Sequence, residues 1–557
     1  MKNFNINWKL IIILFLGFAT SFYMIGEVPP GMSHDELEYV NNGYSIYKTG
    51  KDLYGDFLPL SIGGVGYVAI PAYIAGLPTV FLGLSEASVR LMPIIFSILG
   101  LWFVYGIAKI LFKSEKVALF ASLILALSVW RVMISREMLD SPTALFFYLL
   151  GIFLFLKAKN IQLIVVSLIS LFLGCISYYG AFFIHPFIIL SLIIYRWDLL
   201  KTIKKQFFIS GVVIVCIFGL IVGFMLFQQG QNTRSLGRSS ELIILNVTNI
   251  VDNVIYHRSN SVSIEFFNKL FINKATYIWA KFFSNYFGAF SPRMIFVEGD
   301  PNIIYGLWGR GEFSVLDFPL VLIGIFYLLK RSKRGFLLVA AFIFIAPITS
   351  GLTGQVYATR AFLFWPFLAI LAGGGMAFFW EWTMGMGIKK QIWKKIILFS
   401  FLSFYTFFFF ARMHQYFFRY PVYAKEVWFD SEKQAALYLL AHKDEKITIY
   451  ALEGRQMFME YFFFSKMNPI VAQAALSKDN IRADIQVGNF TFVNGCRDPG
   501  NDPIDHKVMV QTRCVPLNLD LADQKIFARD GSNAIKWGIF TKSGIEKLGK
   551  SKNKKNF

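Results

Sequence analysis

The sequence predicts an α-helical protein that crosses a membrane many times and carries an α/β domain outside the cytoplasm. Hydrophobic residues make up 55% of its 557 residues and charged residues only 16%, whereas soluble globular chains are about 45–50% apolar and about 25% charged. Aromatic residues account for 18%, which is typical of spans with aromatic belts at the membrane interfaces. Long apolar runs recur up to residue 411 and are absent beyond it. This composition excludes a cytosolic enzyme, a disordered regulator and a collagen-like fibre.

The net charge is strongly positive, because 55 lysines and arginines oppose 35 acidic residues. In a soluble protein this balance would suggest a nucleic-acid partner. Here many basic residues lie between apolar runs, where the cytoplasmic loops of membrane proteins collect lysine and arginine. We therefore expect membrane lipids around the chain and no nucleic acid. The four cysteines are too few for a disulfide scaffold or a Cys-rich zinc module.

A bilayer core requires about 20 apolar residues in one helix. The first candidate span, Trp8–Ile25, is too long for the apolar part of a signal peptide and no cleavage site follows it, so we expect it to stay as an anchor. Ten more runs qualify and bring the expected number of spans to eleven: Val89–Leu111, Val117–Trp130, Thr143–Leu156, Ile161–Ser177, Phe182–Tyr195, Phe207–Phe227, Val315–Leu329, Phe336–Ser350, Ala361–Trp380 and Ile396–Ala411.

The segment Tyr67–Leu84 decides the orientation, because counting it as a span would reverse every later loop. It is apolar but contains Pro71, Gly76 and Pro78. With eleven spans and the N-terminus inside, most lysine and arginine clusters face the cytoplasm. With twelve spans, the clusters from Lys113 onward would face outward, against the positive-inside bias. We therefore interpret this segment as an interfacial or re-entrant helix along the outer surface.

This topology predicts three parts along the chain, with the N-terminus inside. The expected parts are a transmembrane domain over residues 1–412 with outer loops 27–88, 131–142, 228–314 and 349–360, an extracytoplasmic α/β domain over 413–546, and a basic disordered tail over 547–557.

Local patterns in the outer domain predict both helices and strands. Cys496 and Cys514 both lie in this domain, where oxidation is possible, so they are a candidate disulfide. Closing that loop would stabilise the domain by about 3 kcal/mol in the chain-entropy model. The expected elements are helices at Ser431–Ala441 and Gln456–Ser465, strands at Ile447–Leu452 and Asn489–Val493, and a hairpin of Lys525–Arg529 and Ala534–Thr541 that turns at Asp530-Gly531.

The first outer loop contains the run Ser33-His34-Asp35-Glu36. Ser33 followed three residues later by Glu36 predicts a capping box and the start of a helix. One interpretation is that Asp35 and Glu36 only favour the positive end of that helix. The alternative is a carboxylate at the membrane surface that acts as a general base or metal ligand, with His34 as a further candidate ligand.

The second outer loop contains Arg136 and Asp140, just before a span that begins near Pro142. Asp140 also occupies a favourable position at a helix start, which is a sufficient structural explanation. In the eleven-span topology it lies on the same side of the membrane as Asp35. Two acids from separate loops are a suitable constellation for a hydroxyl and a divalent cation such as Mg, Mn or Zn.

Arg360 begins the next-to-last expected span from the outside, shortly after Tyr357. One interpretation is an arginine that only extends to the lipid headgroups. Functionally, a guanidinium at this depth is suited to bind a lipid-linked phosphate through paired hydrogen bonds, with Tyr357 assisting. Tyr178 and Tyr179, at another outer turn, are candidates to line an acceptor or sugar pocket.

Taken in order, these motifs resemble the GT-C glycosyltransferases, and among them the protein O-mannosyltransferases and lipid A aminoarabinose transferases. The resemblance covers about Trp8 to Arg412. Glu137 and the long loop Gln228–Ser314 depart from it. The motifs that carry it are Asp35-Glu36, the following Asn-Gly-Tyr and Gly50-Lys-Asp, Ser-Val-Arg90-Leu, Ser-Arg136-x-x-x-Asp140 and the start of the span at Arg360.

The resemblance implies a sugar donor linked to a polyprenyl phosphate and a lipid, glycan or protein acceptor. The lack of eukaryotic sorting signals favours a prokaryotic plasma membrane. It implies Asp35 as the catalytic base with Glu36 beside it, and Asp140 and His34 as candidates for a divalent metal. Arg360, Arg136 and Tyr357 would bind the donor phosphate. Attack by one activated hydroxyl, with an anionic leaving group, predicts inversion at the anomeric carbon.

The sequence leaves two other classes of function open besides a glycosyltransferase. A transporter or flippase of lipid-linked glycans would tolerate loss of Asp35. A proton-coupled transporter normally keeps ionisable groups at mid-membrane, yet acidic residues almost vanish from the expected spans. A membrane-anchored binding protein would use the outer domain as its recognition module.

Overall fold

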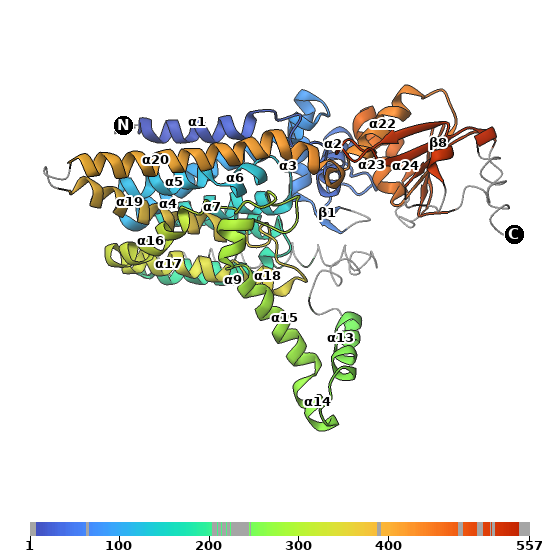
Figure 1. The fold of residues 1–557 in the computed structure, drawn as a ribbon. Coiled ribbons are helices and arrows are strands. Elements are labelled where there is room, and N and C mark those ends of the chain that lie inside the picture. The colour runs from blue at the N-terminus through green and yellow to red at the C-terminus, as the bar shows by residue number, and fades with distance from the viewer. Residues whose placement is uncertain are drawn as a thin grey trace. The chain divides into compact units, whose positions relative to one another are not determined.

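The computed structural model describes residues 7–62, 66–202, 247–386, 391–476, 483–497, 505–512 and 518–544, together with Cys514 and single positions between 203 and 246. The expected span Phe207–Phe227, apart from a few of those positions, and the expected tail 547–557 lie outside the described residues. The chain divides into two compact units (Figure 1). Unit 1 comprises Met1–Tyr23 and Pro93–Gln415, and unit 2 comprises Met24–Met92 and Tyr416–Phe557. The first outer loop therefore groups with the C-terminal domain.

Unit 1 is built of helices. A described helix lies at every expected span except Phe207–Phe227. The helices are α1 (Trp8–Phe22), α4 (Glu86–Phe112, whose first turns belong to unit 2), α5 (Glu115–Leu127), α6 (Val129–Ile134), α7 (Asp140–Lys157), α8 (Ile161–Ile176), α9 (Ala181–Tyr195), α10 (Trp197–Thr202), α13 (Val247–Ser259), α14 (Glu265–Phe271), α15 (Lys274–Gly288), η1 (Arg293–Glu298), α16 (Asp317–Arg331), α17 (Lys333–Ile345), α18 (Ile348–Leu352), α19 (Phe364–Met384) and α20 (Gln391–His414).

Several of these helices are suited to a bilayer, so this is a multi-pass membrane protein. Within the described residues, five segments are long and apolar enough to cross a membrane, and shorter apolar helices accompany them. The number of eleven spans and the inside position of the N-terminus stay predictions. The five segments are Glu86–Phe112, Asp140–Lys157, Lys333–Leu352, Phe364–Met384 and Gln391–Tyr423.

Close packing between α16 and α19 depends on small residues. A Cβ on Gly324 of α16 would collide with the backbone of Leu371 in α19, and a Cβ on Gly375 of α19 would collide with the backbone of Leu320. Since lipid offers no hydrophobic driving force between helices, such close backbone approach is the usual basis of helix association in membranes. The glycines thus explain how these two helices approach each other so closely.

Unit 2 combines the first outer loop with an α/β domain. The expected helices, strands and β7–β8 hairpin are present, and the re-entrant segment contains α3, whose place at the outer surface stays a prediction. The elements are α2 (His34–Thr49), β1 (Ser61–Ile62), β2 (Tyr67–Val68), α3 (Ile70–Leu82), η3 (Gln415–Arg419, whose first residue belongs to unit 1), α21 (Tyr420–Tyr423), η4 (Lys425–Trp428), α22 (Asp430–Ala441), β3 (Ile447–Ala451), α23 (Gly454–Ser465), α24 (Pro469–Ala475), β4 (Ile485–Val487), β5 (Phe490–Asn494), β6 (Lys507–Gln511), η6 (Leu519–Leu521), β7 (Gln524–Phe527) and β8 (Ile535–Phe540).

A six-stranded mixed sheet forms the centre of this domain, in the order β4-β5-β3-β6-β8-β7. β3 is buried along its whole length and pairs in parallel with β5 and β6, whereas the outer pairs are antiparallel. The β7–β8 turn places Gly531 at φ +89°, a conformation that favours glycine. The sheet confirms the α/β class of the C-terminal domain.

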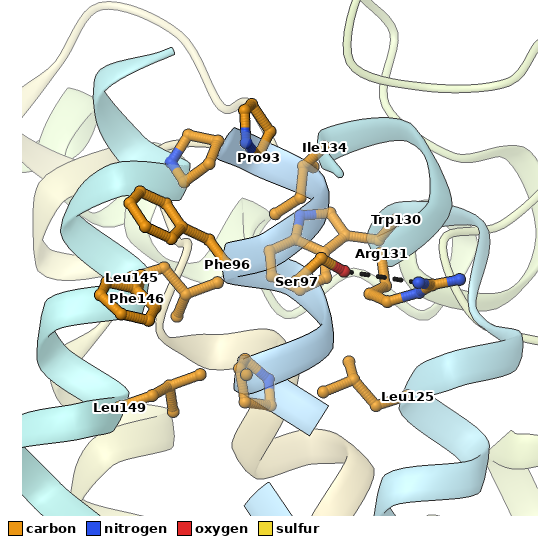
Figure 2. A pocket seen from close by; sticks show the side chains of 13 residues that line it. Pro93, Phe96, Ser97, Leu125, Trp130, Arg131, Ile134, Leu145, Phe146 and Leu149 are labelled. Carbon is orange, nitrogen blue, oxygen red and sulfur yellow. Dashed lines mark hydrogen bonds between the residues drawn. The ribbon is translucent and has the colours of Figure 1, made fainter. Parts of the chain in front are cut away.

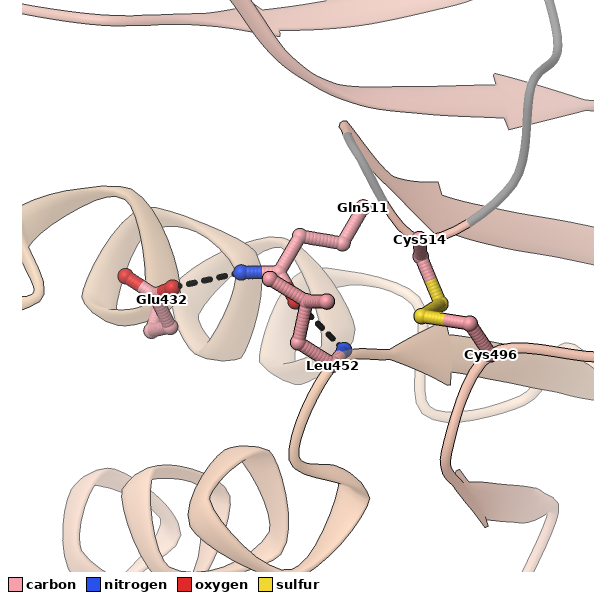
Figure 3. Close-up of a disulfide and its surroundings, with 5 residues drawn as sticks. All are labelled: Glu432, Leu452, Cys496, Gln511 and Cys514. Atoms are coloured by element: carbon pink, nitrogen blue, oxygen red, sulfur yellow. Dashed lines mark hydrogen bonds between the residues drawn. A yellow bond between two sulfur atoms is a disulfide. The ribbon is translucent and has the colours of Figure 1, made fainter. Parts of the chain in front are cut away.

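The candidate disulfide between Cys496 and Cys514 is confirmed, with their Cα atoms 4.8 Å apart (Figure 3). Nearby, the Gln511 amide donates to Glu432 Oε1 at 2.7 Å and accepts from the Leu452 N–H at 2.8 Å. These bonds join the end of β6 to α22 and to the end of β3. The bridge and the glutamine therefore secure the same end of the sheet.

Candidate active site

The capping box predicted for the first outer loop is present at the start of α2. The Glu36 N–H donates to Ser33 Oγ at 3.3 Å, and the Ser33 N–H donates to Glu36 Oε2 at 3.0 Å. Glu36 is fully buried. These contacts give Glu36 a structural role at the helix start, and its expected place in a substrate site stays a prediction.

Asp35 follows the cap and stays partly exposed. The hydroxyl of Tyr67 donates a hydrogen bond to Asp35 Oδ1. Tyr67 is itself buried, and the ring of Tyr39 packs edge-on against it with centroids 5.3 Å apart. The phenol orients the carboxylate without covering it, so Asp35 can accept a proton from a bound hydroxyl. No motif in the sequence pointed to Tyr67.

One turn further along α2, the buried Glu38 pairs with Arg455 from the start of α23. The Arg455 guanidinium also lies over the ring of Tyr54, 5.4 Å from its centroid. Burial raises the pKa of the Tyr54 hydroxyl, so it stays protonated. His34 lies between two carboxylates, with Nε2 3.8 Å from Glu38 Oε1 and Nδ1 3.6 Å from Glu453 Oε2.

We call His34, Asp35, Glu38, Tyr67 and Arg455 the acid cluster. Sequence analysis found the first two and missed the last three. Arg455 lies 417 positions beyond its partner Glu38 in the chain, so no local motif could pair them. The cluster places one accessible carboxylate beside a buried ion pair.

In unit 1, Arg360 ends a tight loop that leads into α19. Its guanidinium donates to the Gln355 carbonyl at 2.5 Å and lies 4.7 Å from the ring centroid of Tyr357. The Tyr357 ring in turn packs against Tyr305 at 5.6 Å. The hydroxyl of Thr349 donates to the Arg360 carbonyl at 2.5 Å. The arginine is thus held from both its side chain and its backbone while staying partly exposed.

Asp140 lies in the same unit as Arg360. It is the first residue of α7, and its Oδ1 accepts the Ser141 N–H at 2.7 Å. Both groups act on the hydroxyl of Tyr178 in the turn before α9. Burial raises the pKa of Tyr178, the charge of Asp140 raises it further and the charge of Arg360 lowers it. Asp140, Arg360 and Tyr178 come from three separate loops of the sequence, and both charges act on the Tyr178 hydroxyl in the folded chain.

A buried carboxylate from a fourth loop holds the loop of Arg360. Asp300 accepts the backbone N–H of Ala358 with Oδ2 and that of Asn302 with Oδ1, the latter at 2.8 Å. Its own N–H donates at 2.8 Å to Glu312, which is fully buried. Burial raises the pKa of Asp300 to about 6, against the opposing effect of the two N–H donors and of Arg360.

Burial and the neighbouring Asp300 raise the pKa of Glu312 well above its ordinary range, so the pair carries at most one charge near neutral pH. We call Asp140, Tyr178, Asp300, Tyr357 and Arg360 the arginine cluster. Asp300 lies in the loop Gln228–Ser314, which departs from the resemblance and received no role from the sequence. Only folding brings it to Arg360.

Arg136 lies elsewhere in unit 1 and is fully buried. Its guanidinium donates to the carbonyls of Ser21 at 3.0 Å and Tyr23 at 2.6 Å, at the end of α1. Arg131 binds the same turn, through the Gly17 carbonyl at 2.9 Å. Cations at a helix C-terminus stabilise it. These contacts are structural, and the expected binding of the donor by Arg136 stays a prediction.

Figure 2 shows Arg131 at the edge of a pocket between α4, α5, α6 and α7. The guanidinium donates to Ser97 at 3.4 Å, and most other lining side chains, such as Phe96, Leu145 and Leu149, are apolar. A sugar needs several hydroxyl partners, so this pocket is a poor candidate for its site.

The residues expected to bind a metal do not form a ligand set within either unit. Asp140 belongs to unit 1 and His34 to unit 2. Among the described residues, no group of three or more His, Cys, Asp and Glu side chains is arranged to hold a metal ion. The divalent metal stays a prediction, and we derive no reaction step through it. The meeting of Asp35 with Asp140 and Arg360 is also still a prediction, because these residues belong to different units.

Comparison with known proteins agrees with this architecture. A protein-family model described as dolichyl-phosphate-mannose-protein mannosyltransferase matches residues 69–222, a range that contains Asp140 but neither Asp35 nor Arg360. No curated protein sequence matches the chain.

The solved structure of ArnT from Cupriavidus metallidurans bound to undecaprenyl phosphate is similar to this chain, with a TM-score of 0.54 and 9% identity over 96% of this chain and 98% of that one. The two proteins therefore share a fold. Together with the family model, this confirms the resemblance to GT-C glycosyltransferases inferred from the motifs.

The oligosaccharyltransferase AglB from Archaeoglobus fulgidus, solved with an inhibitory peptide and a dolichol-phosphate, has a TM-score of 0.46 and 13% identity over 82% of this chain. This chain spans about 63% of the length of AglB. A second AglB structure, a complex with Zn and sulfate, has a TM-score of 0.43 and 13% identity over 90% of this chain and 68% of that one.

Proposed function

We propose that this protein is a membrane glycosyltransferase that transfers a sugar from a polyprenyl phosphate to an acceptor hydroxyl on the outer face of a prokaryotic plasma membrane. The arginine cluster is the observation that carries the proposal. A partly exposed guanidinium is fixed by its own loop and by Thr349, in a fold shared with ArnT, which was solved with undecaprenyl phosphate. Arginine is well suited to bind phosphate through its planar pair of donors.

In this proposal Arg360 holds the donor phosphate and Asp35 acts on the acceptor. Asp35 takes the proton of the acceptor hydroxyl as its oxygen bonds to the anomeric carbon. The bond from that carbon to the phosphate oxygen breaks, and its electron pair leaves with the lipid phosphate. Arg360 stabilises the negative charge that develops on this leaving group. Attack opposite the leaving group inverts the configuration at the anomeric carbon.

In each cluster, the group with the proposed role is accessible: Asp35 in the acid cluster and Arg360 in the arginine cluster. Asp35 is oriented by Tyr67 and stays accessible, as a general base must be. Tyr357 forms one wall beside the guanidinium and Tyr178 lies close to both Asp140 and Arg360. The acceptor is a hydroxyl on a lipid, glycan or protein, and the sugar is a hexose or pentose.

The test measures consumption of radiolabelled polyprenyl-phosphate sugar by membranes that contain the full chain. Asp35→Asn is expected to abolish most turnover at normal protein level. The matched control is Glu27→Gln, which changes an exposed acid of the same loop. Undiminished turnover in Asp35→Asn would refute the proposed base. If the unmodified chain translocates the lipid-linked glycan but transfers no sugar, the result would favour a flippase.

A further inference from the structure

Three helices of unit 1 form a segment that projects from the bundle. Figure 1 shows α15 leaving the bundle at α18 and running away from the long helices, with α14 at its far end and α13 returning beside it. We call residues 247–287 the projecting segment. The Arg258 side chain donates to the Ile272 carbonyl at 2.7 Å and links the end of α13 to the turn after α14. The segment is therefore folded, although most of it lies away from the bundle.

α14 is amphipathic in a way that burial within this chain does not explain. Phe266, Phe267, Leu270 and Phe271 share one face of the helix, because residues three or four positions apart lie on the same side. Their exposed fractions are 67%, 46%, 52% and 66%. The opposite face carries Lys269, which pairs with the glutamate one turn earlier at 2.5 Å. An apolar face of this kind, left open to the surroundings, indicates an interaction surface.

α15 extends this apolar surface back toward the bundle. Trp279, Phe283 and Phe287 follow one another at intervals of four, with successive ring centroids 5.6 Å and 5.9 Å apart. They are 60%, 44% and 60% exposed. The opposite side of α15 contacts the bundle, where the buried Asn285 amide donates to the Thr353 carbonyl at 2.7 Å. The three rings of the aromatic stripe thus remain largely exposed on the side away from this contact.

The charges of the projecting segment favour an anionic surface. Four basic residues, Arg258, Lys269, Lys274 and Lys281, outnumber its two acids, Asp252 and Glu265. Helices that lie in a membrane interface combine such lysines with Trp, Phe and Leu on the other face. Two copies of this chain would bring like charges together at the same surface, which opposes their association.

We propose that the projecting segment lies on the outer leaflet of the bilayer in which the bundle is embedded. The apolar face of α14 and the stripe of Trp279, Phe283 and Phe287 enter the acyl-chain boundary. Lys269, Lys274 and Lys281 stay at the level of the phosphates of anionic phospholipids. Basic side chains near a charged leaflet and aromatic rings at the headgroup level are both favourable there. The segment then attaches unit 1 to the membrane surface beside the helical bundle.

The experiment uses spin labels on the full chain in vesicles of phosphatidylethanolamine and phosphatidylglycerol. Labels are attached to Phe266→Cys and, as the matched control on the opposite face of α14, to Asn268→Cys, in a background of Cys175→Ser and Cys216→Ser that keeps the disulfide. The label at 266 is expected to collide with oxygen several-fold more often than with a water-soluble nickel complex. The label at 268 is expected to show the reverse.

A second pair, Phe283→Cys and Lys281→Cys, repeats the comparison on α15 in case the first pair perturbs folding. Preference for the nickel complex at both apolar positions would overturn the proposal. Dipolar broadening that disappears on dilution with unlabelled chain would also overturn it, because a second copy would then cover the face. Vesicles of phosphatidylcholine alone are expected to raise nickel access at position 266, and an unchanged depth would contradict the role of the lysines.

Discussion

The acid cluster of unit 2 and the arginine cluster of unit 1 hold their exposed groups in different ways. Asp35 is oriented by a hydrogen bond from Tyr67, and the firm contacts around it belong to the neighbouring Glu38–Arg455 pair. Arg360 lies in a loop that is held by Thr349, Asp300 and its own guanidinium. A base must gain a proton in the reaction, whereas a phosphate-binding cation must keep one position. This difference in how Asp35 and Arg360 are held therefore suits their proposed roles, and variants of each cluster test the two roles separately.

The largest expected effect is on the acid cluster. Asp35→Ala is expected to lower kcat by about 10²–10⁴, because general-base help is worth that much. The KM for the lipid-linked donor should stay within about twofold, since a base acts only as the acceptor attacks. The measurement is single-turnover sugar transfer with added formate, which should restore part of the rate. A raised KM with normal kcat would place Asp35 in substrate binding instead.

The next effect concerns the guanidinium. Arg360→Ala is expected to lower kcat/KM by about 10²–10³, in line with the loss of one donor to a developing anion. Arg360→Lys should recover only part of this loss, because it keeps the charge and lacks the planar pair of donors. Steady-state kinetics over a range of donor concentrations check both. The control is Arg293→Ala, at an arginine that is 74% exposed; equal losses in both would argue against a specific role of Arg360.

The third prediction concerns the support of the arginine loop. The pKa of Asp300 rises from 3.8 to about 6 on folding. The folded chain therefore holds this proton more tightly than the unfolded chain does, and the stability that it contributes is complete below pH 4 and lost as pH rises through about 6. Relative to Asp300→Asn, which stays neutral, the wild-type free energy of unfolding should fall by about 3 kcal/mol over this range.

Thermal unfolding in detergent between pH 4 and pH 7 measures this difference. Asp252→Asn, at an exposed acid of the same outer loop, serves as the control and should follow the wild type. A constant gap between the wild type and Asp300→Asn across the range would contradict the buried position of the carboxyl.

The smallest effect is expected at Tyr67. Tyr67→Phe removes one hydrogen bond to Asp35, worth about 0.5–1.5 kcal/mol. The expected fall in kcat is therefore about two- to twelvefold. Tyr73→Phe is the matched control, because its hydroxyl donates to the Pro59 carbonyl at 3.1 Å in the same unit. A loss as large as that of Asp35→Ala would show that the phenol does more than orient the carboxylate.

Features that depend on neighbouring residues were predictable from the sequence. The membrane class follows from composition and apolar length, and the capping box of Ser33 and Glu36 needs only residues three positions apart. The β7–β8 hairpin follows from two alternating runs around Asp530-Gly531. β4, with three residues, is too short for its pattern to stand out and was not predicted. The disulfide was one possibility that the fold then realised.

Tertiary structure alone decided the partners of the candidate groups. Arg455 reaches Glu38 across 417 positions, and Asp300 reaches Ala358 across 58. Pairs so far apart in the sequence leave no periodic pattern. They form only when separate elements pack and their buried charges need partners. The sequence alone therefore determined which chemical groups are candidates for a site and which segments are apolar enough to span a bilayer. Packing decided which of those groups are held, and which stay accessible.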